Sequence, residues 1–290
     1  LPCEVDIASE FRYRDHPLAG DEAAIFISQS GETADTLAAL RHVSGRLAQS
    51  AALVNQTESS IAREAGLVLP IMAGPEIGVA STKAFTAMLT SLAATAVLAA
   101  RARGQIDAGR EAALVADLAE LPRLVTDALA TEAEIALIAQ EMATARDVLY
   151  LGRGILYPIA LEGALKLKEI SYIHAAGYAS GELKHGPIAL VDEDVPVVVL
   201  APKDRLFEKA VSNMQEVMAR GGRVVLLSDR AGIEAAGSGA WQGIAVPDCP
   251  EWLSPVIHAI PVQLLAYHTA LAKGTDVDQP RNLAKSVTVE

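Results

Sequence analysis

The sequence has few of the residues that mark several large classes of protein. It contains two cysteines, Cys3 and Cys249, which are too far apart to suggest a disulfide framework or a zinc site. Basic residues are in the minority, because 24 Lys and Arg stand against 36 Asp and Glu and leave a net charge of −12. A nucleic-acid-binding face needs an excess of basic side chains. We therefore expect neither a metal ion nor a nucleic-acid partner.

Long apolar runs are also scarce. The most apolar run, residues 88–100, is uncharged but shorter than the roughly 20 residues of a membrane span, and it is predicted to be a buried helix. No signal peptide is recognisable, so we expect a cytoplasmic protein without a membrane partner. Residue 1 is not Met, and the residues that follow it have the pattern of a folded segment, which predicts that the chain begins inside a domain.

The composition predicts a folded protein with two similar halves. Hydrophobic residues make up 51% of the 290 residues and charged residues 21%, which supports a large core and argues against disorder. The length is closer to two domains of about 100–200 residues than to one. Short apolar runs alternate with helical patterns, which is typical of parallel strands joined by crossover helices. We predict an α/β fold with two doubly wound parallel sheets.

The predicted elements are similar in order in the two halves. Strands are expected at residues 23–27, 51–54, 67–70, 147–151, 196–201, 223–228 and 243–246. Helices are expected at residues 34–47, 81–103, 159–170 and 204–220, and a connecting pair over residues 109–145, broken at Pro122. The second half opens with a strand, a glycine turn and a helix that have no equivalent before residue 23. If the halves are a duplication, the first half is N-terminally incomplete.

A polar segment, Ser28-Gln29-Ser30-Gly31-Glu32-Thr33, joins the first predicted strand to a helix. The first turn of a helix has unpaired N–H groups and a partial positive charge, so it can hold a phosphate, and hydroxyl and amide side chains add donors. The junction alone fits an ordinary helix cap equally well. Neither G-x-x-x-x-G-K-[ST] nor G-x-G-x-x-G is present, which favours a small phosphorylated metabolite over a nucleotide.

Other candidate residues have ordinary explanations when each is taken alone. Glu162, Lys166 and Glu169 follow spacings of four and three and share one helix face, which is usually a surface ion-pair stripe. His185 lies in a glycine-rich loop and titrates near neutral pH, yet most such histidines have no special role. Lys285 lies near the end of the chain, and Ser81 precedes a helix that it could cap.

Five blocks of sequence together resemble one family. They are SQSGETADTL at 28–37, GPEIGVASTKAF at 74–85, ALEGALKLKEISYIHA at 160–175, GELKHGP at 181–187 and DQPRNLAKSVTVE at 278–290. In this order they resemble the isomerase portion of the glutamine–fructose-6-phosphate aminotransferases, also called glucosamine-6-phosphate synthases. The resemblance covers essentially the whole chain.

The resemblance implies two flavodoxin-like sugar isomerase (SIS) domains in tandem, the first incomplete at its N-terminus. Residues 1–105 would form the first domain, residues 106–275 the connecting helices and the second domain, and residues 276–290 an active-site tail. Two family features are missing from the sequence. One is the N-terminal glutaminase domain with its cysteine nucleophile, for which Cys3 is not a substitute, and which we expect in the full-length protein. The other is the opening strand of the first SIS domain, with its Cys-Gly-Thr-Ser-type turn.

The resemblance also implies an activity and a site. The family converts fructose 6-phosphate and ammonia to glucosamine 6-phosphate, a precursor of amino sugars and the cell envelope, without a metal or an organic cofactor. It implies phosphate contacts from Ser28, Gln29, Ser30 and Thr33, and sugar contacts from Val79, Ser81 and Ala284.

The catalytic roles are likewise implied by the resemblance. Glu169 would move a proton between C1 and C2 of the open-chain sugar, with Lys166 near the sugar hydroxyls. His185 would open the sugar ring, acting across a homodimer interface in the neighbouring subunit's site. Lys285 would form a Schiff base with the ketose carbonyl, which requires a neutral amine.

Two alternatives remain open at the level of sequence. The missing glutaminase domain is compatible with a stand-alone glucosamine-6-phosphate deaminase of the SIS type, which runs the reverse reaction. SIS domains also occur in regulators, so a sugar-phosphate-sensing module without catalysis is the second alternative. The block at 278–290 favours the synthase, because it is nearly complete and contains Lys285.

Overall fold

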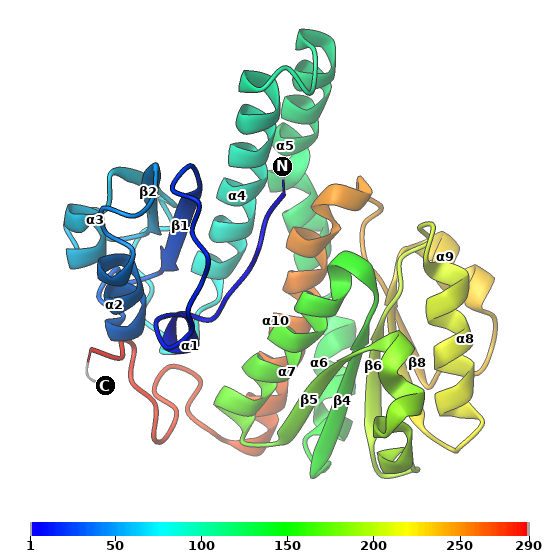
Figure 1. Cartoon of the computed structure of the whole chain (residues 1–290). Coiled ribbons are helices and arrows are strands. Elements are labelled where there is room, and N and C mark those ends of the chain that lie inside the picture. The colour runs from blue at the N-terminus through cyan, green and yellow to red at the C-terminus, as the bar shows by residue number, and fades with distance from the viewer. Residues whose placement is uncertain (1, 289–290) are drawn as a thin grey trace. The chain divides into compact units, whose positions relative to one another are not determined.

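The computed structural model describes residues 2–288, which fold as two compact units (Figure 1). The N-terminal unit comprises residues 1–108 together with residues 281–290, and the C-terminal unit comprises residues 109–280. The last part of the chain therefore returns to the unit in which the chain began.

The N-terminal unit is built on a parallel sheet of three strands in the order β1-β2-β3. Its strands are β1 (Ala23–Ser28), β2 (Gln49–Val54) and β3 (Leu67–Pro70), and its helices are α1 (Ala8–Phe11), α2 (Ala34–His42), α3 (Ser60–Glu64) and α4 (Lys83–Ala102). Side chains of α2 and α3 pack on one face of the sheet around Phe26 and Val54. Those of α4 pack on the other face around Leu53. The strands predicted in this half are confirmed.

The C-terminal unit has five parallel strands in the order β5-β4-β6-β7-β8. They are β4 (Asp147–Gly152), β5 (His174–Ala179), β6 (Pro196–Leu200), β7 (Arg223–Ser228) and β8 (Gln242–Ala245). Every residue of β6 is buried, as expected for an apolar, β-branched strand covered on both faces. The reversal of strand order between β4 and β6 is the switch point of a doubly wound sheet.

Helices cover both faces of this second sheet (Figure 1). They are α5 (Ala108–Leu129), α6 (Glu132–Met142), α7 (Tyr157–Ser171), α8 (Phe207–Met218), α9 (Arg230–Ala236) and α10 (Ser254–Lys273), with short 3-10 helices η1 (Gly154–Leu156), η2 (Ser180–His185), η3 (Pro187–Leu190) and η4 (Glu251–Leu253). One core, which includes Val199, Leu226 and Met214, lies between the sheet and α8. On the other face α7 packs against β4, β5 and α10.

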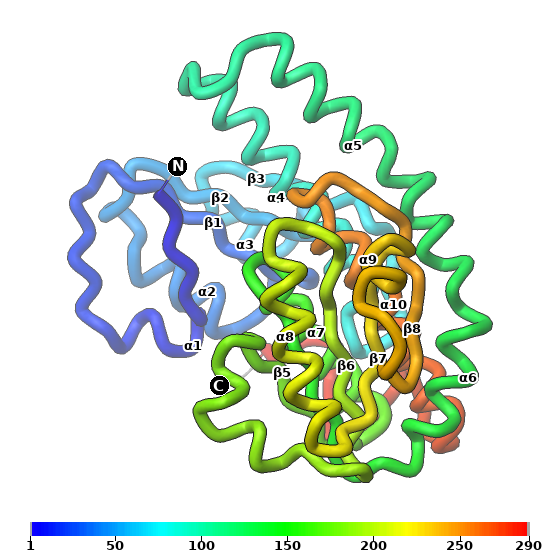
Figure 2. Tube along the Cα trace, turned by 90° about the vertical axis from the view of Figure 1, so that its right-hand side faces the viewer, coloured from blue at the N-terminus to red at the C-terminus, as the bar shows by residue number. Residues whose placement is uncertain are grey.

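Three sequence predictions were wrong. Strand β5 was missed because its sequence, HAAGYA, has small residues in place of the β-branched ones that favour strands. The connecting helices do not break at Pro122, because α5 continues through it and ends at Leu129 (Figure 2). A proline inside a helix removes one hydrogen bond and tends to kink the helix, but it does not always end it.

The third error concerns the apolar run at residues 88–100, which was expected to be buried. It belongs to α4, where the most apolar window is 11% buried, because Ala84 and Val97 are the buried residues of this helix. Among the described residues, α4 has the length and hydropathy of a membrane span. Length and composition alone do not distinguish a membrane span from a helix of a globular domain.

Candidate functional site

The polar loop between β1 and α2 is closed by its own hydrogen bonds. The buried hydroxyl of Ser28 accepts from the N–H of Gly31 at 3.0 Å and lies 2.8 Å from the Thr33 hydroxyl. Gly31 has a φ of +66°, and a Cβ there would lie 1.9 Å from Oγ of Ser59. This position therefore requires glycine on two counts, its backbone conformation and the space available.

The ordinary explanation of this loop, a hydroxyl that caps α2, does not describe its geometry. Thr33 occupies the N-cap position of α2, but its side chain makes no capping hydrogen bond. The Ser30 hydroxyl accepts from the N–H of Glu32 at 3.2 Å, which is a bond within the loop. Gln29 is half-buried. The loop thus gathers three hydroxyls and an amide at the start of a nine-residue helix.

The C-terminal tail docks on this loop and is not a free end. The Ser286 hydroxyl lies 3.0 Å from that of Ser30, and the carbonyl of Val287 accepts from the N–H of Ala34 at 3.0 Å. Lys285 is fixed just before these contacts: its Nζ donates to Oε2 of Glu76 at 2.9 Å and to the carbonyl of Gly78 at 2.7 Å. The structure therefore brings Lys285 and the polar loop together within one unit.

The predicted sugar-contact residues lie in the same unit, in two segments. Val79 and Ser81 lie in the loop that leads to α4, and Ala284 is an exposed residue beside Lys285. The predicted capping role of Ser81 is not observed, because α4 begins after Thr82 and the Ser81 hydroxyl donates to Glu76 at 3.3 Å.

In the C-terminal unit, the charged face of α7 forms a cluster with low solvent exposure. Nζ of Lys166 lies 2.6 Å from Oε2 of Glu169 and 3.6 Å from Oε1 of Glu162. Lys166 is 5% exposed, and lysine is rarely buried to this extent unless it is paired. The interpretation as a surface ion-pair stripe is therefore wrong.

Glu162 is a member of this cluster for which the sequence predicts no role. Burial raises its pKa to about 7; the pairing with Lys166 opposes this rise, and the neighbouring Glu169 adds to it. Within the part of the chain that the structure describes, its Oε1 makes no hydrogen bond and has only the 3.6 Å ion pair with Lys166. The only sequence signal for Glu162 is the helical spacing, which does not show burial.

His185 ends η2 and is largely exposed. Its side chain is 70% exposed, and Nδ1 lies 2.7 Å from Oε2 of Glu182. Glu182 is the polar partner that His185 has among the described residues. The structure thus pairs this imidazole with a carboxylate and does not pair it with the cluster on α7.

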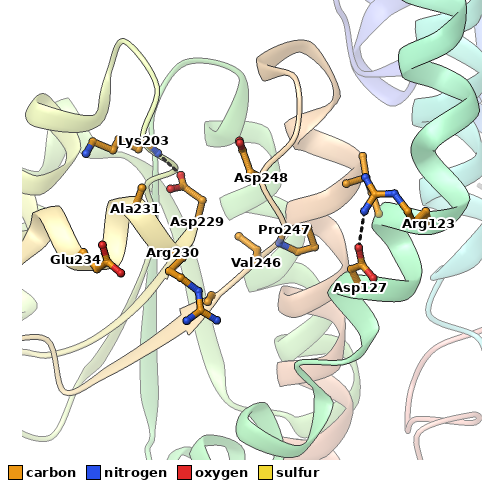
Figure 3. Close-up of a pocket in the computed structure, with 12 residues that line it drawn as sticks. Arg123, Asp127, Lys203, Asp229, Arg230, Ala231, Glu234, Val246, Pro247 and Asp248 are labelled. Carbon is orange, nitrogen blue, oxygen red and sulfur yellow. Dashed lines mark hydrogen bonds and ion pairs between the residues drawn. The ribbon is translucent and has the colours of Figure 1, made fainter.

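A cavity of about 700 Å³ lies in the C-terminal unit, at the carboxyl ends of its strands (Figure 3). It is lined by Lys203 after β6, by Asp229 and Arg230 after β7, and by Asp248 after β8, with Arg123 from α5. None of the predicted site residues lines it. Asp229 is already occupied, since it accepts from the N–H groups of Lys203 and Gly232. Among the described residues, no group of three His, Cys, Asp or Glu side chains is arranged to hold a metal ion.

Comparison with known proteins shows that the fold is that of sugar isomerase domains. Residues 1–98 and 141–273 match the SIS domain family. The C-terminal domain of a glucosamine-fructose-6-phosphate aminotransferase from Francisella tularensis is 46% identical, with a TM-score of 0.93, and the match covers 97% of this chain and 79% of that one.

Curated relatives point to the same group. Glutamine–fructose-6-phosphate aminotransferases (isomerizing) from Bradyrhizobium diazoefficiens and Brucella abortus are 63% and 60% identical over 290 residues, covering 100% of this chain and 48% of each relative. The chain therefore belongs to the SIS-domain family and, within it, to the C-terminal domains of these aminotransferases. It spans about half the length of the curated relatives that it matches. A glucosamine-6-phosphate deaminase from Thermotoga maritima, 24% identical with a TM-score of 0.75, shares the fold.

Proposed function

We propose that this protein converts fructose 6-phosphate and ammonia to glucosamine 6-phosphate. The observation that carries the proposal is the docking of the tail that bears Lys285 onto the polar loop at the start of α2. A phosphate-binding loop and a reactive amine are the two parts that Schiff-base chemistry on a sugar phosphate needs. Relatives that carry the name of this activity support the proposal.

The polar loop holds the phosphate in this proposal. Ser30, Thr33 and Gln29 donate to phosphate oxygens, and the first N–H groups of α2 add a partial positive charge. Ser28 shapes the loop by accepting from the N–H of Gly31, and it is the fourth of the residues that contact the phosphate. Val79, Ser81 and Ala284 contact the sugar. This local attraction suits a chain whose net charge is −12 and which has no general affinity for anions.

The reaction begins with ring opening and Schiff-base formation. His185 donates a proton to the ring oxygen as the C2 hydroxyl loses one, which exposes the C2 ketone. The neutral amine of Lys285 attacks C2, a C–N bond forms, and the carbonyl oxygen leaves as water. Ammonia then replaces the lysine nitrogen at C2 and frees Lys285, which leaves the imine of fructose 6-phosphate.

Glu169 completes the reaction by moving a proton along the sugar. It removes a proton from C1 and a proton is returned to C2, while the C1 hydroxyl loses its proton and the nitrogen gains one. The result is an aldehyde at C1 and an amine at C2. The Lys166 ammonium, 2.6 Å from Glu169, stabilises the negative charge that develops on the oxygen at C1.

The proposal extends to the assembly. His185, with 70% of its side chain exposed, serves the neighbouring subunit of a homodimer, so that one subunit alone lacks a complete site. Ammonia comes from a glutaminase domain of the full-length protein, since the curated relatives are about twice as long as this chain. Residues 276–290 act as the active-site tail. The protein works in the cytoplasm without a cofactor.

The test uses the full-length gene product. It is incubated with fructose 6-phosphate and either glutamine or ammonium, and glucosamine 6-phosphate is measured by mass spectrometry. We expect synthesis with glutamine. Rapid deamination of glucosamine 6-phosphate without synthesis would identify a deaminase, and phosphate-dependent binding without turnover would identify a sensor.

A further inference from the structure

A carboxylate that has no role in the proposed reaction touches the proposed Schiff-base lysine. Glu76 lies in the loop between β3 and α4, and its side chain is 6% exposed. The two oxygens of its carboxylate make different sets of contacts, one with the start of α4 and the other with the tail and the Ser81 hydroxyl.

The first oxygen caps α4. Oε1 of Glu76 accepts from the N–H of Thr82 at 2.8 Å and from the N–H of Ala84 at 3.2 Å. The first N–H groups of any helix lack partners within it, and Thr82, at the N-cap position of α4, makes no side-chain cap. Glu76 therefore supplies from the preceding loop the acceptor that a capping side chain would otherwise provide, and its charge is favourable at a helix N-terminus.

The second oxygen holds Lys285. Oε2 of Glu76 accepts from Nζ of Lys285 at 2.9 Å, and the carbonyl of Gly78 accepts from the same nitrogen at 2.7 Å. Both acceptors lie within three residues of the loop, so they fix the nitrogen beside Val79 and Ser81. The tail contacts of Ser286 and Val287 follow immediately in the chain.

We propose that Glu76 is a positioning residue for Lys285, and that its carboxylate joins the docked tail to the first turn of α4. The proposal rests on the role proposed above for Lys285. Attack on a ketone needs the lone pair of the amine, so the ammonium of Lys285 first releases one proton to solvent. The two hydrogens that remain on the neutral nitrogen are enough for the bonds to Oε2 of Glu76 and to the carbonyl of Gly78, and Glu76 thereby places the nitrogen for attack. Glu76 itself does not react with the sugar.

The charge of Glu76 is part of this arrangement. Burial acts to raise the pKa of the carboxyl group, but the hydrogen bonds from Lys285, Thr82 and Ala84 together outweigh it, and the pKa lies below its ordinary value. The group is therefore ionised at neutral pH. A glutamine in its place keeps an oxygen that can cap α4 but loses the charge that pairs with Lys285.

The experiment compares Glu76→Gln with Glu76→Asp and with the control Glu58→Gln. Glu58 is an exposed carboxylate of the same unit. The first measurement is the reductive trapping of fructose 6-phosphate on Lys285 by borohydride, followed by peptide mass spectrometry. The second is the amide hydrogen exchange of Ala34, whose N–H bonds to the docked tail, and needs no substrate.

We expect trapping in Glu76→Gln to slow about tenfold or more, the effect of losing a hydrogen bond between charged groups, with no change in the fructose 6-phosphate concentration at half-maximal rate. Exchange at Ala34 should accelerate, Glu76→Asp should recover part of both, and Glu58→Gln should match the wild type. If Glu76 had a purely structural role, Glu76→Gln would raise the half-maximal fructose 6-phosphate concentration and lower thermal stability. It would not slow trapping at an unchanged half-maximal concentration.

The outcomes separate this proposal from the proposed function. If the wild type is not trapped on Lys285, the proposed function fails, while exchange at Ala34 still reports whether Glu76 docks the tail. If the wild type is trapped and Glu76→Gln equals it in both measurements, the positioning role is overturned. If Glu76→Gln does not fold, Lys285→Met removes the ion pair between Glu76 and Lys285 by changing the lysine. Unchanged amide exchange at Ala34 in Lys285→Met would overturn the proposal.

Discussion

The loop after β1 and the loop after β6 occupy the same place in the two units, yet they carry different chemistry. Each follows a strand that pairs in parallel with the next strand along the chain, β2 in one unit and β7 in the other. After β1 the loop contains hydroxyls, an amide and one carboxylate, that of Glu32, which accepts from the N–H of Ser60. The N–H groups of Gly31 and Glu32 donate to hydroxyls of the loop itself. After β6, Asp204 accepts from the N–H of Leu206 at 2.7 Å, and Asp229 accepts from that of Lys203 at 2.5 Å.

This difference shows that topology alone does not make an anion site. Carboxylates already occupy backbone donors at the end of β6, and their negative charge would repel a phosphate. The chemistry of the C-terminal unit lies instead on a helix, in the cluster of Glu162, Lys166 and Glu169 on α7. In the proposed function, one unit holds the anion and the carboxylates of the other move protons.

The largest expected effect tests the amine of the N-terminal unit. Lys285→Ala should abolish borohydride trapping of fructose 6-phosphate, because it removes the amine that Glu76 and the Gly78 carbonyl hold. Lys83→Ala, which removes an exposed lysine of the same unit, should leave trapping intact. Mass spectrometry of the labelled peptide measures both. Continued trapping in Lys285→Ala would remove this residue from its proposed role.

The next effect separates proton transfer from anchoring. Glu169→Gln should slow the exchange of the C1 proton of fructose 6-phosphate with deuterated water by about 10²–10⁴-fold, the usual contribution of a general base, while trapping on Lys285 continues. Glu134→Gln, an exposed carboxylate on α6, is the control. Proton NMR follows the exchange. An unchanged rate in Glu169→Gln would assign the base to another group.

A third variant tests the backbone of the polar loop. Gly31→Ala should lower the free energy of unfolding by about 2–4 kcal/mol, because it adds a Cβ to a left-handed conformation and forces that atom onto Ser59. Gly104→Ala is a matched control with the same φ of +66° and nothing within 4 Å of the added Cβ, and it should cost about 1 kcal/mol. Thermal or urea unfolding measures both. Equal losses would show that the contact with Ser59 is relieved at little cost.

A fourth effect tests a pH dependence that belongs to the C-terminal unit. Burial raises the pKa of Glu162 from its ordinary 4.5 to about 7, so the folded chain binds this proton more tightly than the unfolded chain. The resulting stability is fully present below about pH 4.5 and is lost as the pH rises through about 7. Over this range the free energy of unfolding falls by about 3 kcal/mol through this group.

Glu162→Gln cannot ionise, so its free energy of unfolding should fall less than that of the wild type between pH 4.5 and pH 7. Urea titrations across this range measure the difference, and Glu134→Gln should follow the wild type. Parallel pH profiles for Glu162→Gln and the wild type would show that Glu162 is not held protonated by the fold.

Much of the fold could be predicted from residue patterns. Apolar runs such as VVVL in β6 and VVLL in β7 have few alternatives to a buried strand, and the predicted boundaries of β3 are those of the structure. Strand β5 could not be found in this way, because alanine and glycine carry almost no periodic signal and the pairing with β4 decides its conformation. Without β5, the second sheet is predicted to have fewer strands than it has, and the two sheets are predicted to be more alike in size than they are.

The candidate site likewise has features that follow from local sequence and features that do not. The amino-acid sequence by itself determined which groups are available: the hydroxyl-rich loop at residues 28–33, the spacing of Glu162, Lys166 and Glu169, and a lysine near the end of the chain. Residue type and spacing within one segment are properties of the sequence, so they can be recognised without the tertiary structure.

Only the tertiary structure decided how these groups are used. The burial of the cluster on α7, the docking of the tail on the polar loop and the contact of Glu76 with Lys285 depend on segments that meet in space, the last of them 209 positions apart. Burial and long-range hydrogen bonds change the protonation and the mobility of a group, and no local pattern records them. For this reason residue patterns near the end of the chain do not show docking by themselves, whereas the fold places Ser286 and Val287 on the polar loop.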